Sequence, residues 1–428
     1  MRVMVVGASG LIGSAVCARL AARGDTIVAI IHRPADLGLV PADVFQTDLA
    51  RATEADWLAR LSRVDAVVNC AGLLQDAPGE STRGVHVAGA VALFRACERA
   101  GVRRVIHLSA VGVDRDTPTE FSRTKLVGDH ALMERDLDWV ILRPSVVIGR
   151  AAYGGSALMR GLAAAPLVPI MPGTGPLQIV HLDDLVDAVV FFLKPHAPVR
   201  GAFDVVGPRT WSFEETVVLL RRWLRWPPAR KFHPPAPLAA VVYKIGDAIA
   251  WLGWRPPART TARREILRGA TGDPGPLARA TGIEPRDPAA VLTAESSSVQ
   301  ERWFARLYLL KPLVIAILSL FWIATGLMAL GPGWKEGVGL MLEGGVEHGL
   351  AEATVVAGAA ADICIGIGIA FRRTAKCALY AALALSVTYV IIGTVLVPRL
   401  WINPIGPLLK IWPIMALILV AIAIVEDR

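Results

Sequence analysis

The sequence predicts an α/β protein with a doubly wound parallel sheet, a small substrate-side lobe and a four-helix transmembrane domain. Two patterns support this: short apolar segments alternate with helical segments over the first half of the chain, and four long apolar runs follow residue 306. Strict alternation of strands and helices indicates a parallel sheet, and apolar runs of roughly 20 residues are long enough to cross a bilayer. We therefore divide the chain into 1–210, 211–305 and 306–428.

Seven segments of the first region have the apolar character of buried strands. Helical patterns lie between them, most clearly over 85–100 and 122–134. In an open parallel sheet, ligands bind beyond the carboxyl ends of the strands, so we expect functional side chains directly after each strand. The expected strands are 2–6, 26–31, 44–47, 66–69, 105–108, 139–142 and 203–206.

A glycine-rich turn follows the first strand and precedes a helical segment. Glycines allow a tight turn and a close approach to a pyrophosphate, which the N–H groups of the following helix attract. The spacing GxxGxxG also fits an ordinary strand-to-helix turn. Because this motif opens the alternation of strands and helices, it predicts a Rossmann-like dinucleotide site. The expected contacts are Gly7, Ser9, Gly10, Leu11, Ile12 and Gly13.

Polar residues after the second and third strands fit the adenosine half of a dinucleotide. His32 and Arg33 stand where an NAD-selective site would offer an acid to the ribose, whereas an arginine suits a 2′-phosphate. We therefore favour NADP(H) over NAD(H), the alternative being that Arg33 is a solvated loop residue. Asp48 follows the third strand and could accept from the adenine amino group.

The later strands end in residues that suit the nicotinamide half. Cys70, Ala71 and Gly72 form a turn of small residues that lets a cofactor pass close to the backbone. Ser109 ends the fifth strand and Pro144 ends the sixth, next to Arg143.

Together these motifs resemble an atypical or extended short-chain dehydrogenase/reductase of the epimerase/dehydratase kind over about residues 1–300. The chain most resembles the subgroup that includes the NAD(P)H-binding accessory subunit of respiratory complex I. The C-terminal region resembles a DoxX-like domain, a family linked in part to quinone-coupled redox proteins. The motifs that carry these resemblances are 7–13, Asp48, 69–72, 107–109, Lys125 with Gly128 and Asp129, Arg143 with Pro144, 172–184 and 401–410.

The chain departs from the family at its proton donor. Catalytic members carry a tyrosine four residues before the lysine, but Phe121 precedes Lys125 here, and His86 stands where relatives often have asparagine. The resemblance still implies that Ser109 polarises a carbonyl and that Lys125 binds the nicotinamide ribose. Tyr153 could supply a proton from another direction, or it could be part of the pocket wall.

The four apolar runs cover 312–330, 350–371, 377–397 and 405–425. The alternative interpretation is a set of buried helices in a large soluble domain. Cations flank alternate ends of the runs, which the positive-inside rule interprets as four spans of the cytoplasmic membrane with both termini in the cytoplasm. These cations are Arg302, Arg306, Lys311, Arg372, Arg373, Lys376 and Arg428.

The middle region, 211–305, combines many arginines with tryptophans in a chain of net charge +8. This mixture could bind nucleic acid, but the attached membrane domain favours a lipid surface, because cations and tryptophan both suit the headgroup layer. The segment 237–253 is an apolar helix candidate, either packed in the lobe or lining a pocket open to the bilayer. The five cysteines have no metal-binding spacing, and we expect no metal site.

Inside the membrane region, Asp362 needs an explanation because a carboxylate within a span is costly. His348, Glu352 and Asp362 fall on one face of a helix, which fits a quinone or proton path or simple pairing with Lys410 or Asn403. Two functions follow from the sequence. One is an NADP(H)-dependent oxidoreductase acting on a lipid-soluble substrate such as a quinone or isoprenoid. The other is a non-catalytic NADP(H)-binding module that serves a membrane protein partner.

Overall fold

The structure is a computed structural model that describes residues 1–34, 37–38, 40 and 42–426. It separates into two compact units. The first unit contains Met1–Ala248 and Pro256–Ala305, and the second contains Ile249–Arg255 and Arg306–Arg428. Most of the middle region therefore packs with the sheet. Arg428, one of the cations used to predict topology, lies outside the described residues.

The first unit is built around a parallel sheet of seven strands in the order β10-β6-β5-β4-β1-β2-β3. The order reverses between β1 and β4, and this is the place where doubly wound sheets bind ligands. The predicted strands agree with the observed ones to within about two residues at each end, as expected for boundaries. They are β1 Arg2–Val6, β2 Thr26–Ile31, β3 Ala42–Gln46, β4 Ala66–Asn69, β5 Arg104–Leu108, β6 Asp138–Pro144 and β10 Gly201–Val205.

Helices cover both faces of this sheet and bury separate apolar cores. On one face, α1 and α6 contribute Leu20 and Val189, and on the other, α2, α3 and α4 contribute Trp57, Phe94 and Leu132. The sheet is thus covered on both sides, which explains its continuous apolar strands. The helices are α1 Leu11–Ala22, α2 Glu54–Arg60, the π-helix η1 Gly84–Gly89, α3 Ala90–Ala100, α4 Glu120–Met133 and α6 Leu182–Phe192.

A third core belongs to the lobe beside the sheet. Met159 and Leu162 of α5 pack there with Val217 and Leu220 of α7. Short paired strands, β7 with β9 and β8 with β11, link this lobe to the main sheet region. The elements are β7 Val146–Ile148, α5 Gly154–Ala164, β8 Leu167–Pro169, β9 Ile179–His181, α7 Phe213–Trp223, β11 Arg230–Phe232, α8 Ala236–Trp251, α9 Thr260–Arg268, α10 Gly275–Thr281 and α11 Pro288–Ala294.

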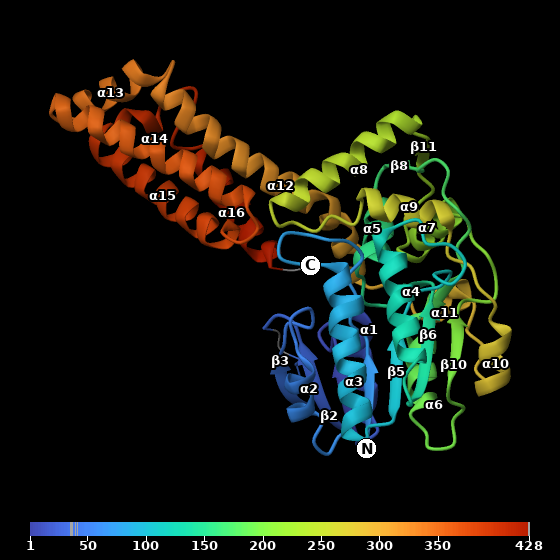
Figure 1. The fold of residues 1–428 in the computed structure, drawn as a ribbon. Helices are drawn as coiled ribbons and strands as arrows, with labels where there is room; N and C mark the ends of the chain where they lie inside the picture. Colours follow the sequence, from blue (N-terminus) through green and yellow to red (C-terminus); the bar gives the residue numbers. More distant parts are fainter. Residues whose placement is uncertain (35–36, 39, 41, 427–428) are drawn as a thin grey trace. The chain divides into compact units, whose positions relative to one another are not determined.

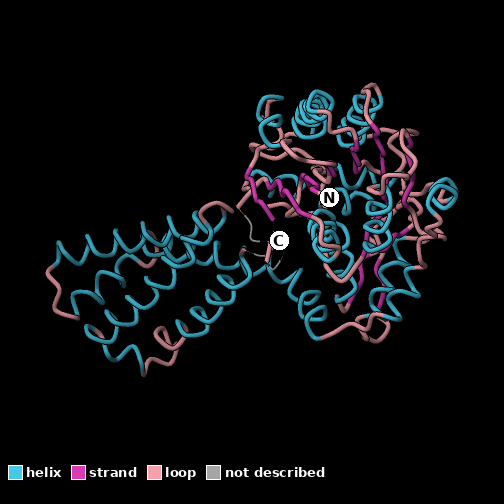
Figure 2. The backbone as a smooth tube through the Cα atoms, turned by 90° about the horizontal axis from the view of Figure 1, so that it is seen from below, coloured by secondary structure: helices cyan, strands magenta, loops and turns pink. Residues whose placement is uncertain are grey.

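The second unit consists of long apolar helices that lie side by side in both views (Figures 1 and 2). Among the described residues, α12, α14 and α15 are long and apolar enough to cross a membrane. The short helix α13 between the first two was not predicted. The elements are α12 Val299–Leu330, α13 Trp334–Glu343, α14 His348–Ala370, α15 Ala375–Leu396, the 3₁₀ turn η2 Pro398–Trp401 and α16 Ile411–Val425.

The fourth predicted span is shorter than expected. It begins at Ile411 rather than at residue 405, because Asn403 closes a turn by accepting from the Ile405 N–H and Pro404 and Pro407 disfavour a helix. Its 15 residues rise roughly 22 Å, less than the roughly 30 Å of a hydrocarbon core. The turn before α16 would therefore have to lie within the bilayer for the segment to cross it.

Ion pairs and hydrogen bonds at the two ends of this unit show how its helices alternate. Arg399, after α15, pairs with Glu343 at the end of α13. At the opposite end, Arg372 between α14 and α15 donates to the carbonyl of Val425, the last residue of α16. Neighbouring helices therefore run in opposite directions.

Asp362 of α14 is buried in this unit, and its partner differs from the predicted ones. The Tyr389 hydroxyl of α15 donates to Asp362 Oδ1 at 2.8 Å. Asn403 instead bonds within its own turn. The sequence prediction missed Tyr389 because the pairing joins two helices 27 residues apart. His348 and Glu352 pair at 3.4 Å on an exposed surface, so the expected continuous polar face is divided.

Candidate functional site

The glycine turn between β1 and α1 is a backbone cradle. Gly7 has a φ of +79°, which favours glycine. A Cβ atom at Gly13 would lie 2.2 Å from the Gly7 carbonyl oxygen, so only glycine fits there. The first intrahelical hydrogen bond of this turn is donated by Ser14 to Gly10, which leaves the N–H groups of Leu11, Ile12 and Gly13 at the open helix end. This end can attract a diphosphate.

The turn after β4 lies against the glycine turn. A Cβ atom at Gly7 would lie 3.0 Å from the backbone nitrogen of Ala71. Asn69 fixes this second turn, because its Oδ1 accepts from the Ala71 N–H at 3.1 Å. The backbone of Cys70, Ala71 and Gly72 is thereby held beside the glycine cradle, as the sequence predicts for a cofactor-lining turn.

Lys125 of α4 links the ends of β4 and β5. Its ammonium donates to the Leu108 carbonyl at 2.7 Å and to the Ala71 carbonyl at 3.4 Å. A Cβ atom at Gly72 would lie 3.5 Å from Lys125 Nζ, so the ammonium also borders the turn after β4. Burial lowers the pKa of Lys125 to about 8, against the opposing effect of Asp129. A buried ammonium that titrates near neutral pH suits proton transfer.

Phe121 lies one helical turn before Lys125 and contacts His86 instead of offering a hydroxyl. The two rings meet edge to face with centroids 5.7 Å apart. His86 Nε2 accepts from the Leu73 N–H at 3.0 Å, which places the ring proton on Nδ1, 2.9 Å from Thr124 Oγ1. Burial, together with Lys125 and His107, lowers the pKa of His86 to about 2. His86 is therefore a neutral structural link rather than an acid.

Close helix packing holds this arrangement. His86 lies on the π-helix η1, and a Cβ atom at Gly128 of α4 would lie 2.5 Å from the His86 carbonyl oxygen. The absence of a side chain at Gly128 lets α4 cross η1 closely. π-helical turns of this kind occur frequently at functional sites.

Ser109, His107 and Asp129 place three buried polar atoms together behind Lys125. Ser109 Oγ, His107 Nε2 and Asp129 Oδ1 make no hydrogen bond of normal geometry among the described residues. His107 accepts from Asn69 at Nδ1, so its Nε2 carries the proton and faces Asp129 Oδ1 at 3.7 Å. Buried polar atoms are rarely left without partners. The Ser109 hydroxyl interacts with the Asp129 carboxylate but makes no hydrogen bond of normal geometry, so it could still donate to a ligand.

Asp129 is held in place by an ion pair. Arg143 Nε and Nη2 each donate to Asp129 Oδ2 at 3.1 Å, and Arg143 Nη1 donates to Asp114 at 2.5 Å. Burial raises the pKa of Asp129, while Ser109 and Arg143 oppose that effect. Pro144, at the end of β6, accepts from the Val111 N–H at 3.1 Å and so fixes the loop after β5.

The residues after β2 are arranged around an acid that the sequence prediction missed. Arg33 donates to Glu80 at 2.9 Å, and Glu80 comes from the loop after β4. His32 lies 3.9 Å from both Glu80 and Asp48. Asp48 accepts from the Ala50 N–H through Oδ1, which orients its carboxylate. Arg33 is thus an ion-paired residue rather than a freely solvated one.

Tyr153 comes later in the chain than the other predicted site residues. It precedes α5, and 44% of it is exposed. Its predicted catalytic role stays a prediction, as does the alternative of a pocket wall.

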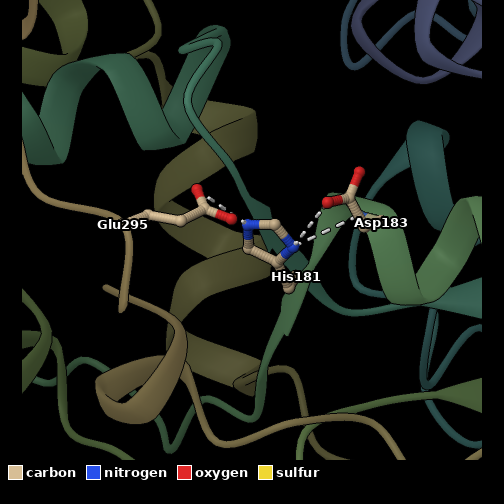
Figure 3. A group of neighbouring side chains, drawn as sticks. All are labelled: His181, Asp183 and Glu295. Atoms are coloured by element: carbon tan, nitrogen blue, oxygen red, sulfur yellow. Dashed lines mark hydrogen bonds and ion pairs between the residues drawn. The ribbon is translucent and has the colours of Figure 1, made fainter. Parts of the chain in front are cut away.

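One cluster of possible metal ligands lies beside the lobe, formed by His181, Asp183 and Glu295. Figure 3 shows the two acids approaching different nitrogens of the His181 ring. Nδ1 accepts from the Asp183 N–H at 3.3 Å and lies 3.3 Å from Arg286 Nη2, so the proton is on Nε2 and faces Glu295. A protonated nitrogen and a neighbouring guanidinium do not favour a cation, and the cluster links α6 to the segment 286–295.

Sequence reasoning did not assign roles to His107, Asp129 or Glu80. The spacing offers one signal for Asp129, because residues 121, 125 and 129 are four apart and share a face of α4. No local pattern relates Glu80 to Arg33, which is 47 residues away.

The chain matches two families. Residues 3–205 match the NAD dependent epimerase/dehydratase family, and residues 319–419 match the DoxX-like family. The chain therefore joins an N-terminal epimerase/dehydratase-type domain, with an NAD(P)-binding fold, to a C-terminal DoxX-like domain. Its apolar helices suggest association with a lipid bilayer.

Similar proteins include several reductases. Dihydroflavonol 4-reductase of Zea mays is 28% identical over 250 residues, covering 46% of this chain and 68% of that protein. Ceramide reductase of Caulobacter vibrioides is 24% identical over 220 residues, covering 49% and 67%. Sterol demethylase protein B of Methylococcus capsulatus is 30% identical over 175 residues, covering 35% and 52%.

Solved structures share the fold of the first unit. UDP-glucuronic acid 4-epimerase of Bacillus cereus, in complex with UDP-glucuronic acid and NAD, matches with a TM-score of 0.55 and 17% identity. The match covers 72% of this chain and 99% of that one.

Proposed function

We propose that this chain is a membrane-anchored NADP(H)-dependent oxidoreductase that acts on a lipid-soluble substrate. The observation that supports the proposal is that the same site contains a glycine cradle and two buried polar side chains, Ser109 and Lys125. Ser109 Oγ is buried without a hydrogen bond of normal geometry among the described residues, and Lys125, which donates to the neighbouring Leu108 carbonyl, has a pKa lowered to about 8 by burial. A module that only binds a dinucleotide could use Lys125 to hold the ribose, but it would have no need for the Ser109 hydroxyl.

The residues present fit a dinucleotide. Gly7, Gly10 and Gly13 leave room at the open end of α1, and the N–H groups there suit a diphosphate. When bound, the cofactor would supply or accept a hydride. Arg33 supports NADP(H), because its guanidinium can pair with a 2′-phosphate. Glu80 opposes this preference because it already neutralises part of the Arg33 charge.

The chain's own residues would handle the substrate oxygen. The Ser109 hydroxyl donates to that oxygen and polarises it. The Lys125 ammonium uses two N–H groups on the Leu108 and Ala71 carbonyls and keeps a third for proton transfer. In a reduction, the substrate carbon gains a hydride, its oxygen gains the proton of Lys125, and solvent recharges the amine. Lys125 thereby supplies the proton that a tyrosine hydroxyl would supply if a tyrosine stood in place of Phe121.

A lipid-soluble substrate such as a quinone or isoprenoid is supported by the attached DoxX-like domain. Two of the relatives are named for ceramide and sterol, which are lipids. We further propose a cytoplasmic-membrane location with the first unit and both termini in the cytoplasm. The cations Arg372 and Arg373 between α14 and α15, together with Lys376 at the start of α15, support this orientation under the positive-inside rule. A tag after Arg428 that is reached only from outside would contradict it.

Phe121 favours a second function, in which the chain binds NADP(H) without turnover and serves a membrane protein partner. One assay distinguishes the two functions. The full chain in detergent is mixed with NADPH and a short-chain quinone or a ketone lipid, and absorbance at the nicotinamide band is followed. The enzyme predicts oxidation that falls at least about 100-fold in Ser109→Ala, with NADPH affinity unchanged. Tight NADPH binding without oxidation of any acceptor supports the module.

A further inference from the structure

Helix α8 presents large apolar side chains outward from the first unit. Leu238, Val241, Val242 and Ile245 are 49%, 49%, 40% and 52% exposed. Their spacing of i, i+3, i+4 and i+7 places them on one side of the helix. These four residues form a continuous surface that we name the α8 stripe.

The opposite side of α8 carries small residues and faces the protein. Ala239, Gly246 and Ala250 are buried there, together with Tyr243. A Cβ atom at Gly246 would lie 2.0 Å from the Ala258 carbonyl oxygen, so this side is closely packed. A helix that borders water normally buries its large apolar residues and exposes polar ones. In α8 the larger aliphatic residues point outward.

The charges along α8 suit an anionic lipid surface. Lys244 is exposed, as is Arg230 before the helix, whereas Lys231 pairs with Glu214. Asp247, the acid within the helix, is held by Arg259 at 3.1 Å and by Thr260. The exposed charges near the stripe are therefore mainly positive, and cations near anionic headgroups strengthen membrane binding.

The chain directly after α8 belongs to the apolar second unit. Within that unit, the Leu252 carbonyl accepts from the Arg372 N–H at 2.9 Å, and Trp254 Nε1 donates to the Ala370 carbonyl at 2.7 Å. Residues 370–372 lie where α14 gives way to α15, two helices long enough to cross a bilayer. Such a link lies at the membrane surface, and Leu252 follows the last residue of α8, Trp251, directly in the chain.

Trp251, at the end of α8, is 79% exposed. Tryptophan is enriched at the headgroup level because its ring is apolar while its N–H is polar. Its position between the α8 stripe and the residues tied to Ala370 agrees with a helix end at the membrane surface.

We propose that the α8 stripe is immersed in the interfacial layer of the lipid bilayer. Leu238, Val241 and Ile245 then contact acyl chains, whereas Lys244 and Trp251 lie among the headgroups. The lipid surface is the occupant because the stripe is aliphatic, its neighbours are cationic and the adjoining chain enters the membrane unit. This contact holds with or without turnover, so its test is independent of the proposed oxidoreductase activity.

The test places a polarity-sensitive fluorophore on the stripe of the full chain. Cys364 and Cys377 are replaced by serine, and Val241→Cys or Ile245→Cys is labelled in nanodiscs of phosphatidylcholine and phosphatidylglycerol. The matched control is Val199→Cys, 38% exposed on the first unit before β10. The labelled parent without an added cysteine corrects for Cys70. We expect doxyl-lipid to quench the labels at 241 and 245 at least twofold, and the label at 199 not at all.

Three results would overturn the proposal. In the first, iodide in the aqueous phase quenches the labels at 241 and 245 as strongly as the label at 199. The α8 stripe would then be exposed to water. Labels shielded from both quenchers, with energy transfer between differently labelled copies in one nanodisc, would show that a second copy covers the stripe. Labels shielded from both quenchers without energy transfer would show that another part of the chain covers it.

Discussion

The two halves of the candidate site are built by different means. The half around β1 and α1 depends on backbone shape. Gly7 has a left-handed conformation, and Gly13 lies so close to the Gly7 carbonyl oxygen that a side chain would not fit. The half around β5 and α4 depends on side chains, namely Lys125, Ser109 and Asp129. The backbone that suits a diphosphate and the groups that suit proton transfer therefore belong to different elements, and Phe121 lies in the second half.

The largest loss of NADPH affinity is expected from Gly13→Val, which changes the backbone half of the site. A Cβ atom at Gly13 would approach the Gly7 carbonyl oxygen to 2.2 Å, so the turn or α1 must move. We expect NADPH affinity to fall at least about 1000-fold, about 4.1 kcal/mol, as measured by nicotinamide fluorescence. The matched control is Gly10→Ala, whose Cβ would meet the same oxygen at 3.3 Å. Equal losses in both variants would contradict the close-packing argument.

Asp129→Asn should be the next most severe change, and it acts on the side-chain half. It leaves the buried Arg143 without its full charge partner, and breaking a buried ion pair typically costs about 3 kcal/mol. We expect a lower midpoint of thermal unfolding for the full chain in detergent. Asp136→Asn, which removes one partner of the exposed Arg103, should leave the midpoint unchanged. A midpoint equal to the parent's in Asp129→Asn would show that the pair is not structurally required.

Lys125→Met should weaken NADPH binding about tenfold, about 1.4 kcal/mol, and remove a pH dependence. Burial lowers the pKa of Lys125 to about 8, so the ammonium is present below that pH and lost above it. The parent should therefore bind NADPH less tightly as pH rises from 7 to 9, whereas Lys125→Met should change little. Arg123→Met, an exposed cation on the same helix, is the control. A parent with no such pH dependence would contradict the assigned role.

The smallest effect is expected from Glu80→Gln, which tests cofactor choice in the backbone half. Removing the carboxylate takes away one charge partner of Arg33, which favours its pairing with a 2′-phosphate. The ratio of NADPH to NADH affinity should rise about threefold, about 0.7 kcal/mol, and Arg33→Glu should lower it. Glu54→Gln, another acid paired with an arginine, should leave the ratio unchanged. If neither substitution changes the ratio of NADPH to NADH affinity, our preference for NADP(H) is contradicted.

The sequence allowed prediction of most of the fold but only part of the site. The strands and glycine turn could be predicted because apolar runs and turn residues are local patterns. Lys125 and the missing hydroxyl at Phe121 followed from the resemblance to a family that carries a tyrosine four residues before its lysine. The contacts of Glu80 with Arg33 and of Tyr389 with Asp362 could not be predicted, because each joins segments that only folding brings together.

By itself, the sequence determined an alternating α/β region that opens with a glycine cradle and is followed by long apolar helices. These features follow from periodicity and from the conformational freedom of glycine. The tertiary structure alone decided which buried polar groups meet, since Ser109, His107 and Asp129 come together only when α4 packs against the sheet. It also decided that α8 turns its small residues inward and its large ones outward. Periodicity identifies the faces of a helix, but only packing determines which face meets the protein.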